Sequence, residues 1–319
     1  MEAMGKLKGK KILVTGGTGF VGSHLVESLI SEGSRVIVPF RSLDPGSYFA
    51  TQKLAKKVTL VSGDLKDFSR MFDIVTKYEI DYIFHLGAQA IVTTAYNNPR
   101  ETITTNVLGT TNILEAARLY GSVKGIIVAS SDKAYGKSTK KYVESDPLRG
   151  DHPYEVSKSS ADLISLAYAK TYNMPIVVTR FGNIYGEGDL NFNRIIPSVL
   201  NAIITHTRLD IRSDGMFVRD YVYVKDVVVG YRVLLDCIDK SKGEAYNLSS
   251  GESLTVLEVI NTIETMLKKK VQYSILNTQQ NEIPYQSLNF DKVKGLGYAP
   301  SYTLKKVLAK VYLWYLNNT

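Results

Sequence analysis

The chain is poor in the residues that mark secreted, metal-binding and membrane-spanning proteins. Its 319 residues include one cysteine, Cys237, and four histidines. A single thiol excludes an internal disulfide, so we expect a reducing, cytoplasmic setting. The histidines lack metal-ligand spacing, and we expect no metal. No apolar run is long enough to span a membrane, and the basic start MEAMGKLKGKK leads into ILVTGG without the apolar core of a signal peptide.

Acidic residues are the minority among the charged side chains. Lysine and arginine number 39 and aspartate and glutamate 31, which gives a net charge of +8. The lysines are scattered, and no aromatic residues alternate with arginines as they do on base-stacking surfaces. We therefore expect no nucleic-acid partner and a surface that favours small anions.

Short apolar runs alternate with segments of helical length in the first part of the chain. The runs are KILV at 11–14, RVIVPF at 35–40, VTLVSGDL at 58–65, YIFHLGA at 82–88, GIIVAS at 125–130 and PIVVTRFG at 175–182. Segments such as 105–120 and 157–172 fit helices. This alternation predicts an α/β fold, a doubly wound parallel sheet (Rossmann) in residues 1–182 with helices on both faces.

The pattern loosens after about residue 183, which predicts a smaller C-terminal substrate-binding lobe over 183–319. NRIIPSVLNAII and TVLEVINTIETML fit helices, VRDYVYVKDVVVGYRVLLDCI fits a short strand and a helix, and a last helix starts near Leu304. In doubly wound sheets ligands bind in the crevice at the carboxyl ends of the strands. We therefore expect the active site between the two parts.

The stretch GGTGFVG follows the first predicted strand and opens a predicted helix. Glycines permit a tight turn there and let backbone N–H groups approach a pyrophosphate, beside the positive end of the helix. We expect Gly16, Gly19, Phe20, Val21 and Gly22 to contact a dinucleotide. The alternative is a glycine-rich turn without a ligand.

The residues at the end of the second predicted strand indicate whether the adenosine ribose of the cofactor carries a 2′-hydroxyl or a 2′-phosphate. NAD-selective sites place a carboxylate there, but this chain has Arg41 and Ser42. A guanidinium suits a 2′-phosphate, so the sequence favours NADP. The alternative is that Arg41 is a surface charge and that NAD is held by other groups.

Two further strand ends contribute candidate cofactor contacts. Asp64 and Leu65 end the third strand, where an adenine can be contacted. Leu86 and Ala88 lie in HLGAQ at the end of the fourth strand, and the small residues there would let a cofactor lie close. We interpret His85 as a packed strand residue rather than a catalyst.

The stretch YEVSK places Tyr154 and Lys158 four residues apart at a helix start, on one face. An ammonium beside a phenol lowers the pKa of the phenol and makes it a general base near neutral pH. A hydroxyl from Ser131 would complete the set around a substrate alcohol. The alternative is a helical tyrosine with a solvated lysine.

An acid and a base stand side by side after the fifth predicted strand, in SSDKAYG. Asp132 and Lys133 are the pair. They suit a reaction that removes one proton and delivers another. The alternative is a salt bridge or a capping pair in a loop.

With these motifs the chain resembles the extended short-chain dehydrogenases/reductases, in the group of nucleotide-sugar epimerases and dehydratases. The resemblance runs from ILVTGGTGFVGSHL through PYEVSK and VRDYVYVKD to GLGYAPSYTL. It implies a Rossmann domain, a bound NAD(P) cofactor and a nucleoside-diphosphate sugar in the second lobe. It also implies that Ser131, Tyr154 and Lys158 are the catalytic hydroxyl, tyrosine and lysine.

Within that group, the Asp132-Lys133 pair resembles the CDP-glucose 4,6-dehydratases, where many other dehydratases have Asp-Glu. GAQAIV, GNIYGEGD, RIIP and NEIPYQSLNFDKVKGLGY are also similar to that subfamily, whereas VRDYVYVKD is generic. Arg41 conflicts with the NAD that this subfamily implies. The alternatives are a 4-epimerase, in which the pair is not catalytic, and a cofactor-binding scaffold without turnover.

The resemblance also implies the steps of the reaction and the residues that bind the substrate. Tyr154 takes the C4-hydroxyl proton and hydride leaves for the nicotinamide. A neutral Lys133 then removes the C5 proton, Asp132 protonates the departing 6-hydroxyl, and hydride returns to C6. Candidate substrate contacts are Gln89, Asn183, Arg194 and Arg219, the arginines because a diphosphate calls for guanidinium.

The family's usual assembly implies a homodimer. The segments 97–120 and 154–172 would then pack as a four-helix bundle between two copies. Apolar positions in them, Ile113, Leu114, Leu163 and Leu166, can equally face the sheet. The sequence leaves both arrangements open.

Overall fold

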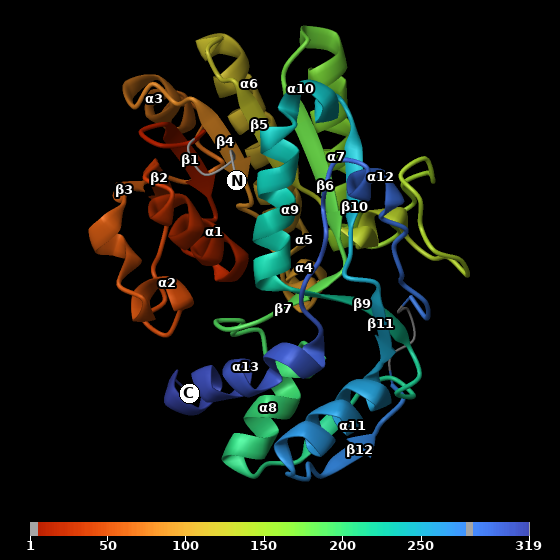
Figure 1. The fold of residues 1–319 in the computed structure, drawn as a ribbon. Coiled ribbons are helices and arrows are strands. Elements are labelled where there is room, and N and C mark those ends of the chain that lie inside the picture. The colour runs from red at the N-terminus through yellow and green to blue at the C-terminus, as the bar shows by residue number, and fades with distance from the viewer. Residues whose placement is uncertain (1–5, 279–282, 319) are drawn as a thin grey trace.

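A seven-stranded sheet forms the centre of the computed structural model, which describes residues 6–278 and 283–318. The start of MEAMGKLKGKK and the first two residues of NEIPYQ therefore lie outside the described residues. The strand order is β10-β6-β5-β4-β1-β2-β3, and all neighbours are parallel (Figure 1). The strands are β1 (Lys11–Thr15), β2 (Arg35–Phe40), β3 (Thr59–Ser62), β4 (Tyr82–His85), β5 (Gly125–Ala129), β6 (Ile176–Phe181) and β10 (Ala245–Leu248).

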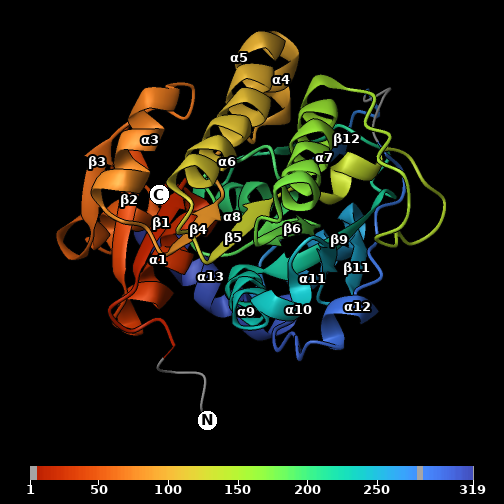
Figure 2. The same cartoon turned by 90° about the horizontal axis from the view of Figure 1, so that it is seen from above.

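Helices cover both faces of this sheet, as Figure 2 shows from above. One layer holds α3 (Phe68–Lys77), α6 (Gly109–Tyr120) and α7 (Pro153–Tyr172), and the other holds α1 (Phe20–Ser31) and α9 (Val224–Asp236). Alternate strand residues serve the two layers. In β1, Leu13 joins the core beneath α3 and α6, while Ile12 and Val14 join the core beneath α1 and α9. The predicted doubly wound Rossmann sheet is confirmed.

The predicted division at residue 182 does not describe how the chain is shared between the two parts. After β6 the chain enters the smaller lobe, and it then returns through α9 and β10 to the large sheet, where β10 pairs with β6. The sequence of β10 is AYNL, which is only four residues long and is interrupted by the polar Asn247. It lacks the continuous apolar run that indicated the other strands.

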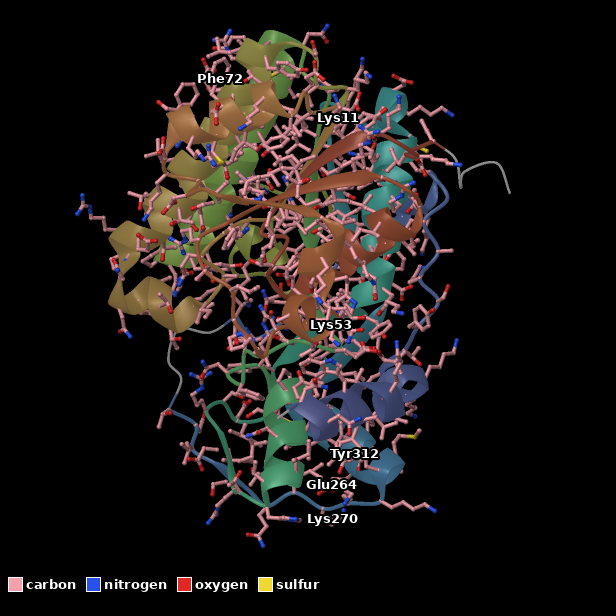
Figure 3. The ribbon with its side chains drawn as sticks, turned by 90° about the vertical axis from the view of Figure 1, so that its left-hand side faces the viewer. Lys11, Lys53, Phe72, Glu264, Lys270 and Tyr312 are labelled. Carbon is pink, nitrogen blue, oxygen red and sulfur yellow. The ribbon has the colours of Figure 1, made fainter. Side chains whose placement is uncertain are left out.

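The smaller lobe packs three helices around its own apolar core. Buried side chains of α8 (Ile195–Thr205), α11 (Val256–Leu267) and α13 (Leu304–Asn318) meet there. Its strands are β7 (Asn183–Tyr185), β8 (Leu209–Ile211), β9 (Val218–Tyr223), β11 (Glu252–Thr255) and β12 (Tyr273–Ile275). They form a β11-β9-β7 sheet and a β12-β8 pair. In Figure 3 Lys11 and Phe72 lie at the end of the large domain, and Glu264 and Lys270 at the far end of the lobe.

Short helical segments connect these elements. They are α2 (Tyr48–Thr51), η2 (Leu54–Lys57), α4 (Val92–Asn97), α5 (Pro99–Ile103), η3 (Thr104–Leu108), η4 (Asp132–Tyr135), α10 (Ile238–Ser241) and α12 (Asp291–Lys294). The segment η3 is a π-helical turn that leads directly into α6. Within the described ranges, no helix is both long enough and apolar enough to cross a membrane.

Candidate active site

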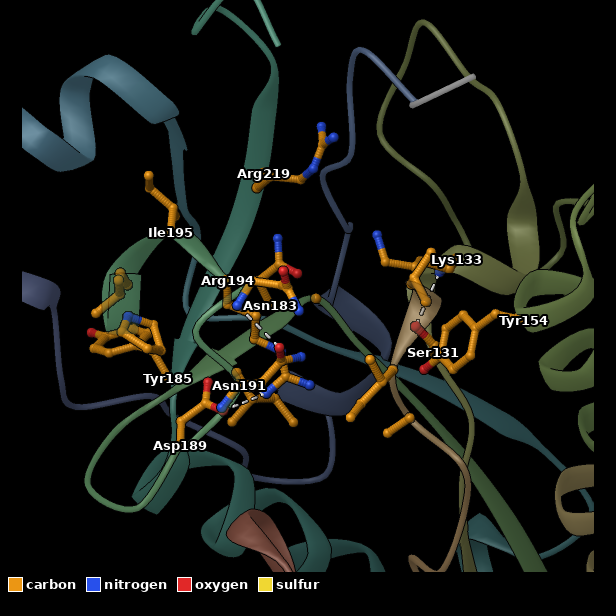
Figure 4. Close-up of a pocket in the computed structure, with 18 of the residues that line it drawn as sticks. Ser131, Lys133, Tyr154, Asn183, Tyr185, Asp189, Asn191, Arg194, Ile195 and Arg219 are labelled. Atoms are coloured by element: carbon orange, nitrogen blue, oxygen red, sulfur yellow. Dashed lines mark hydrogen bonds and ion pairs between the residues drawn. The ribbon is translucent and has the colours of Figure 1, made fainter. Parts of the chain in front are cut away.

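A cleft of about 990 Å³ separates the carboxyl edge of the large sheet from the smaller lobe. Ser131, Lys133 and Tyr154 lie on one wall, and Asn183 and Arg194 face them from the other (Figure 4). The wall with Ser131, Lys133 and Tyr154 is formed by the end of β5 and the start of α7. The opposite wall is formed by β7 and the turn before α8. The cleft thus lies where a doubly wound sheet binds its ligands.

The glycine turn after β1 forms the floor of the cleft. Gly16 has φ +69°, a left-handed conformation that favours glycine. A Cβ at Gly22 would lie 2.1 Å from the Gly16 carbonyl oxygen, so only glycine lets α1 start this close to the strand. Phe20 and Val21 also line the cleft, and no side chain caps the N-terminus of α1 at Gly19. Free N–H groups and a bare backbone suit a pyrophosphate.

The end of β4 lies beside this turn. Leu86 and Ala88 line the cleft. His85 is buried behind them, and its ring nitrogens lie 2.8 Å from the Thr15 hydroxyl and 3.0 Å from the Thr110 hydroxyl. Burial lowers the pKa of His85 to about 3, with Lys158 acting in the same direction. The imidazole is therefore neutral and packed between hydroxyls.

The two residues predicted to read the ribose lie at the surface. Arg41 has a half-exposed side chain and Ser42 is exposed, and neither lines the cleft. Arg41 forms ion pairs with Glu101 and Asp64. Asp64 caps its own turn through the backbone N–H of Lys66, at 2.9 Å. Leu65 packs against Gly109 of α6 and against Gly87.

The acid–base pair begins the short helix η4, directly after β5. The Ser131 hydroxyl accepts a hydrogen bond from the backbone N–H of Lys133 at 3.2 Å and donates to Asp132 Oδ1 at 3.1 Å. Asp132 is 3% exposed. Burial raises the pKa of Asp132, although Lys133, Ser131 and Arg219 favour the charged form. A carboxyl group whose pKa is raised in this way is better suited to donating a proton than an ordinary one.

Tyr154 and Lys158 lie on the first two turns of α7, buried against the end of β5. The Lys158 ammonium donates to the Ala129 carbonyl at 2.9 Å. Burial lowers the pKa of Lys158 to about 8 and raises the pKa of Tyr154 to about 12. The sequence predicted a lowered phenol pKa, and this is wrong for the protein alone, because burial outweighs the favourable effects of Arg194 and Ser131. A further positive charge at the phenol is needed to ionise it near neutral pH.

The predicted substrate contacts separate into two sets. Asn183, Arg194 and Arg219 line the cleft. Arg194 binds both carboxylate oxygens of Asp189 at 3.0 Å, which fixes its guanidinium at the start of α8. The Gln89 side chain instead bonds to the backbone of Ile91, at 3.0 and 3.1 Å, and does not line the cleft.

Three residues of this site were missed in the sequence. Gln286 is fully buried and accepts a hydrogen bond from Lys133 Nζ at 3.2 Å. Asn106, in η3, accepts from the backbone N–H of Gln89 at 2.7 Å and donates to Ser157 at 2.9 Å, so it ties the β4 loop to α7. Glu155 lines the cleft beside Tyr154, and burial raises its pKa. Gln286 lies in the IPYQSL stretch and Glu155 lies in YEVSK, whereas Asn106 had no signal in the sequence.

No cluster of three or more histidine, cysteine, aspartate or glutamate side chains able to hold a metal occurs among residues 6–278 and 283–318. The chemical groups gathered here are instead a phenol, an ammonium, a hydroxyl, a carboxyl group and a second lysine. Together they can move protons to and from a substrate alcohol.

Comparison with known proteins gives one family over nearly the whole chain. A family model described as GDP-mannose 4,6 dehydratase matches residues 13–311. The chain is 28% identical over 324 residues to human dTDP-D-glucose 4,6-dehydratase, covering 97% of this chain and 91% of the relative. It is 27% identical over 329 residues to CDP-glucose 4,6-dehydratase of Salmonella typhimurium, covering 97% and 91%.

A plant relative is longer than this chain. The trifunctional UDP-glucose 4,6-dehydratase/UDP-4-keto-6-deoxy-D-glucose 3,5-epimerase/UDP-4-keto-L-rhamnose-reductase of Arabidopsis thaliana is 29% identical over 330 residues. The match covers 99% of this chain and 48% of that protein, so the chain spans about half the length of that relative.

Solved structures with this fold include both dehydratases and epimerases. The dTDP-glucose 4,6-dehydratase of Bacillus anthracis, in complex with NAD, has a TM-score of 0.84 at 28% identity, covering 97% of each chain. The UDP-glucose 4-epimerase of Thermotoga maritima, with UDP-glucose, has a TM-score of 0.87 at 28% identity, covering 96% of this chain and 99% of that one. The backbone therefore does not separate the two reactions.

Proposed function

This chain belongs to the GDP-mannose 4,6-dehydratase family, and from that premise we propose that it dehydrates a nucleoside-diphosphate hexose, CDP-glucose or a close analogue, to the 4-keto-6-deoxy sugar. One observation carries the choice of reaction. A buried carboxyl group, Asp132, lies next to Ser131 and Lys133 on the same wall of the cleft as Tyr154. An epimerase needs the hydroxyl, the tyrosine and the lysine, but it has no use for a second acid–base pair.

The first step is oxidation at C4. Ser131 and Tyr154 bind the C4 hydroxyl, and the phenolate of Tyr154 takes its proton. The Lys158 ammonium, protonated below a pKa of about 8, supports that phenolate from the next turn of α7. A nicotinamide dinucleotide held by the glycine turn would supply the hydride acceptor and, when oxidised, a positive charge that favours the phenolate.

The second step is loss of water across C5 and C6. The C4 ketone acidifies the C5 hydrogen, which Lys133 removes in its neutral form. Asp132, whose burial favours the protonated form, delivers its proton to the departing 6-hydroxyl. Lys133 then gives its proton back to C5, and a reduced nicotinamide held at the glycine turn would return the hydride to C6, so the net loss is one water.

The proposed cofactor is NADP, because Arg41 and Ser42 replace the ribose-binding carboxylate at the end of β2. NAD is the alternative, since the Bacillus anthracis structure is described with NAD. The glycine turn, with Gly16, Gly19 and Gly22, fits the pyrophosphate of either.

A 4-epimerase is the second candidate function. The Thermotoga maritima epimerase matches this fold as closely as the dehydratase structure does. In that case Asp132 and Lys133 would only hold η4 in place.

Mass spectrometry decides between the two reactions. Purified protein is incubated with CDP-, GDP-, UDP- and dTDP-hexoses, and the cofactor is released by denaturation and identified. We expect a product one water lighter from one of the four. A product of unchanged mass would establish the epimerase, and no product from any sugar despite bound cofactor would favour a scaffold.

We also propose a homodimer formed through α6 and α7. Ile113 and Leu114 are buried against the sheet, whereas Leu119, Leu163 and Tyr172 are each at least half exposed on the outer face. Such apolar residues on neighbouring helices suit a second copy. Light scattering should give the mass of a dimer, and Leu163→Lys should shift it toward a monomer.

A further inference from the structure

Four charged side chains meet beyond the ribose end of the cofactor cleft, and the sequence placed only two of them there. Arg41 follows β2, and Asp64 and Lys66 follow β3. The fourth is Glu101, which belongs to α5. Two cations therefore face two carboxylates, and the cluster has no net charge.

Glu101 is the centre of this cluster. Its Oε1 lies 3.1 Å from Arg41 Nη1 and its Oε2 lies 2.9 Å from Lys66 Nζ. Asp64 is more distant, at 3.6 Å from Arg41 and 3.7 Å from Lys66. The Glu101 carboxylate therefore holds both cations, although Asp64 is nearer to them in the sequence.

Local structure fixes Glu101 in this position. The Asn98 side chain caps α5 by accepting from the Glu101 backbone N–H at 3.1 Å. One turn later, the Thr105 hydroxyl donates to Glu101 Oε1 at 3.1 Å. Hydrogen bonds from Lys66 and Arg41 lower the pKa of Glu101 to about 2, so it is an anion at neutral pH. The carboxylate is held in place by three neighbours and carries a full charge.

This carboxylate occupies the donors that a ribose 2′-phosphate requires. The end of β2 is where a doubly wound sheet binds the adenosine ribose, and guanidinium and ammonium groups are the natural partners of a phosphate. We propose that Glu101 is a selectivity-determining residue, whose carboxylate competes with the 2′-phosphate of NADP for Arg41 and Lys66 and so weakens the preference for NADP that Arg41 alone would give. The inference rests on the proposed function only in that a nicotinamide dinucleotide binds at the glycine turn.

The physical reason is that the two cofactors meet the cluster differently. The 2′-hydroxyl of NAD is neutral and leaves both ion pairs of Glu101 intact. The 2′-phosphate of NADP carries nearly two negative charges. It must share Arg41 and Lys66 with Glu101 or displace it, at a cost in lost ion pairs and like-charge repulsion.

A competition experiment on the full-length protein tests this. Wild type and Glu101→Gln are equilibrated with an excess of equimolar NAD and NADP, freed of unbound ligand and denatured, and the released cofactors are quantified by mass spectrometry. Glutamine keeps the size of the side chain and removes its charge. We expect the NADP-to-NAD ratio to rise on the order of tenfold, since a phosphate gains two charge-assisted partners.

Two further variants make the result specific. Glu244→Gln removes a carboxylate that pairs with Lys292 at 3.0 Å at the opposite edge of the sheet, and the ratio should stay at the wild-type value. In Glu101→Gln with Arg41→Ala the gain should be much smaller, because Arg41, one of the two cations that Glu101 releases, is no longer there.

Three outcomes would overturn the inference. A ratio within twofold of wild type in Glu101→Gln means that Glu101 does not compete. A fall in the ratio means that Glu101 instead orients Arg41 for the phosphate. A wild-type protein that retains neither dinucleotide would overturn this inference together with the cofactor part of the proposed function, whereas the first two outcomes leave the proposed function standing.

Discussion

The ionisable groups inside the cleft and those just beyond its ribose end are held in opposite ways. At the catalytic end Asp132, Tyr154 and Lys158 are each less than a tenth exposed. Asp132 is hydrogen-bonded to the Ser131 hydroxyl and Lys158 to the Ala129 carbonyl, and burial is the main cause of the pKa shifts of all three groups. At the ribose end the Arg41 side chain is 54% exposed and that of Glu101 29%, and each is paired with opposite charge.

The difference fits the role that we propose for each end. Proton transfer near neutral pH needs groups whose pKa lies away from its ordinary value, and removal from water is the strongest way to move it. Choice between two cofactors that differ by one phosphate needs only a balance of charge. Exposed ion pairs supply such a balance, but salt screens them and each contributes little to stability.

The largest expected effect is the loss of C4 oxidation when Tyr154 is replaced. Tyr154→Phe removes the group proposed to take the C4 proton, so the rate of cofactor reduction by substrate should fall about 10⁴-fold, at the upper end for acid–base catalysis. Stopped-flow absorbance of the reduced nicotinamide measures this step. Tyr168→Phe, which removes a hydroxyl from the same helix but outside the cleft, is the matched control and should react normally.

The next largest effect distinguishes the residue proposed for water loss, Asp132, from the residue proposed for C4 oxidation, Tyr154. Asp132→Asn keeps the shape of the side chain and removes its proton, so water loss should slow by about 10²- to 10³-fold while C4 oxidation continues. The reduced cofactor should therefore accumulate with substrate before any dehydrated product appears by mass spectrometry. Equal slowing of both steps would contradict the assignment of Asp132 as the acid for the 6-hydroxyl.

A third prediction concerns a buried carboxyl group under the catalytic end. Asp220 is fully buried in β9, accepts hydrogen bonds from Ser249 at 2.7 Å and from the backbone of Leu288 at 3.1 Å, and lies close enough to Asp132 to sense its charge. Burial raises the pKa of Asp220 to about 7. The folded state thus binds the proton more tightly than the unfolded state.

Its contribution to stability must therefore decline as pH rises between the unfolded pKa of about 4 and the folded pKa of about 7. Urea unfolding of wild type should show a loss of up to about 4 kcal/mol across this window that Asp220→Asn does not show. Parallel curves for the two proteins would mean that Asp220 stays charged in the folded state.

Short-range patterns were sufficient to predict most of the sheet and the catalytic wall. Continuous apolar runs indicated every strand from β1 to β6, and YEVSK put Tyr154 and Lys158 on one face of α7. The strand β10 was missed because AYNL is short and has a polar residue, Asn247, inside it. Its place in the sheet depends on pairing with β6, from which it is separated by the smaller lobe.

The predictions about the site that were wrong or incomplete concern contacts between residues far apart in the sequence. The lowered pKa predicted for Tyr154 was based on one neighbour, Lys158, whereas burial of the side chain by the whole domain raises that pKa. Arg41 was identified as a charge at the ribose end, but its partner Glu101 is 60 residues away on another element. Likewise, Gln286 reaches Lys133 across 153 residues. Sequence spacing carries no information on such pairs.

The smallest expected effect belongs to the ribose end and sharpens the contrast in exposure. Because Arg41 and Lys66 are partly exposed, raising the salt from about 50 to 500 mM should weaken NADP binding several-fold. NAD binding should change less, since its ribose carries no phosphate, and the rate of C4 oxidation at saturating cofactor should not change, because Tyr154 and Lys158 are shielded from salt. In Arg41→Ala the salt dependence of NADP binding should flatten toward that of NAD. An unchanged salt dependence in this variant would mean that the phosphate is held elsewhere, and the two ends of the cleft would then no longer differ in the way their exposure indicates.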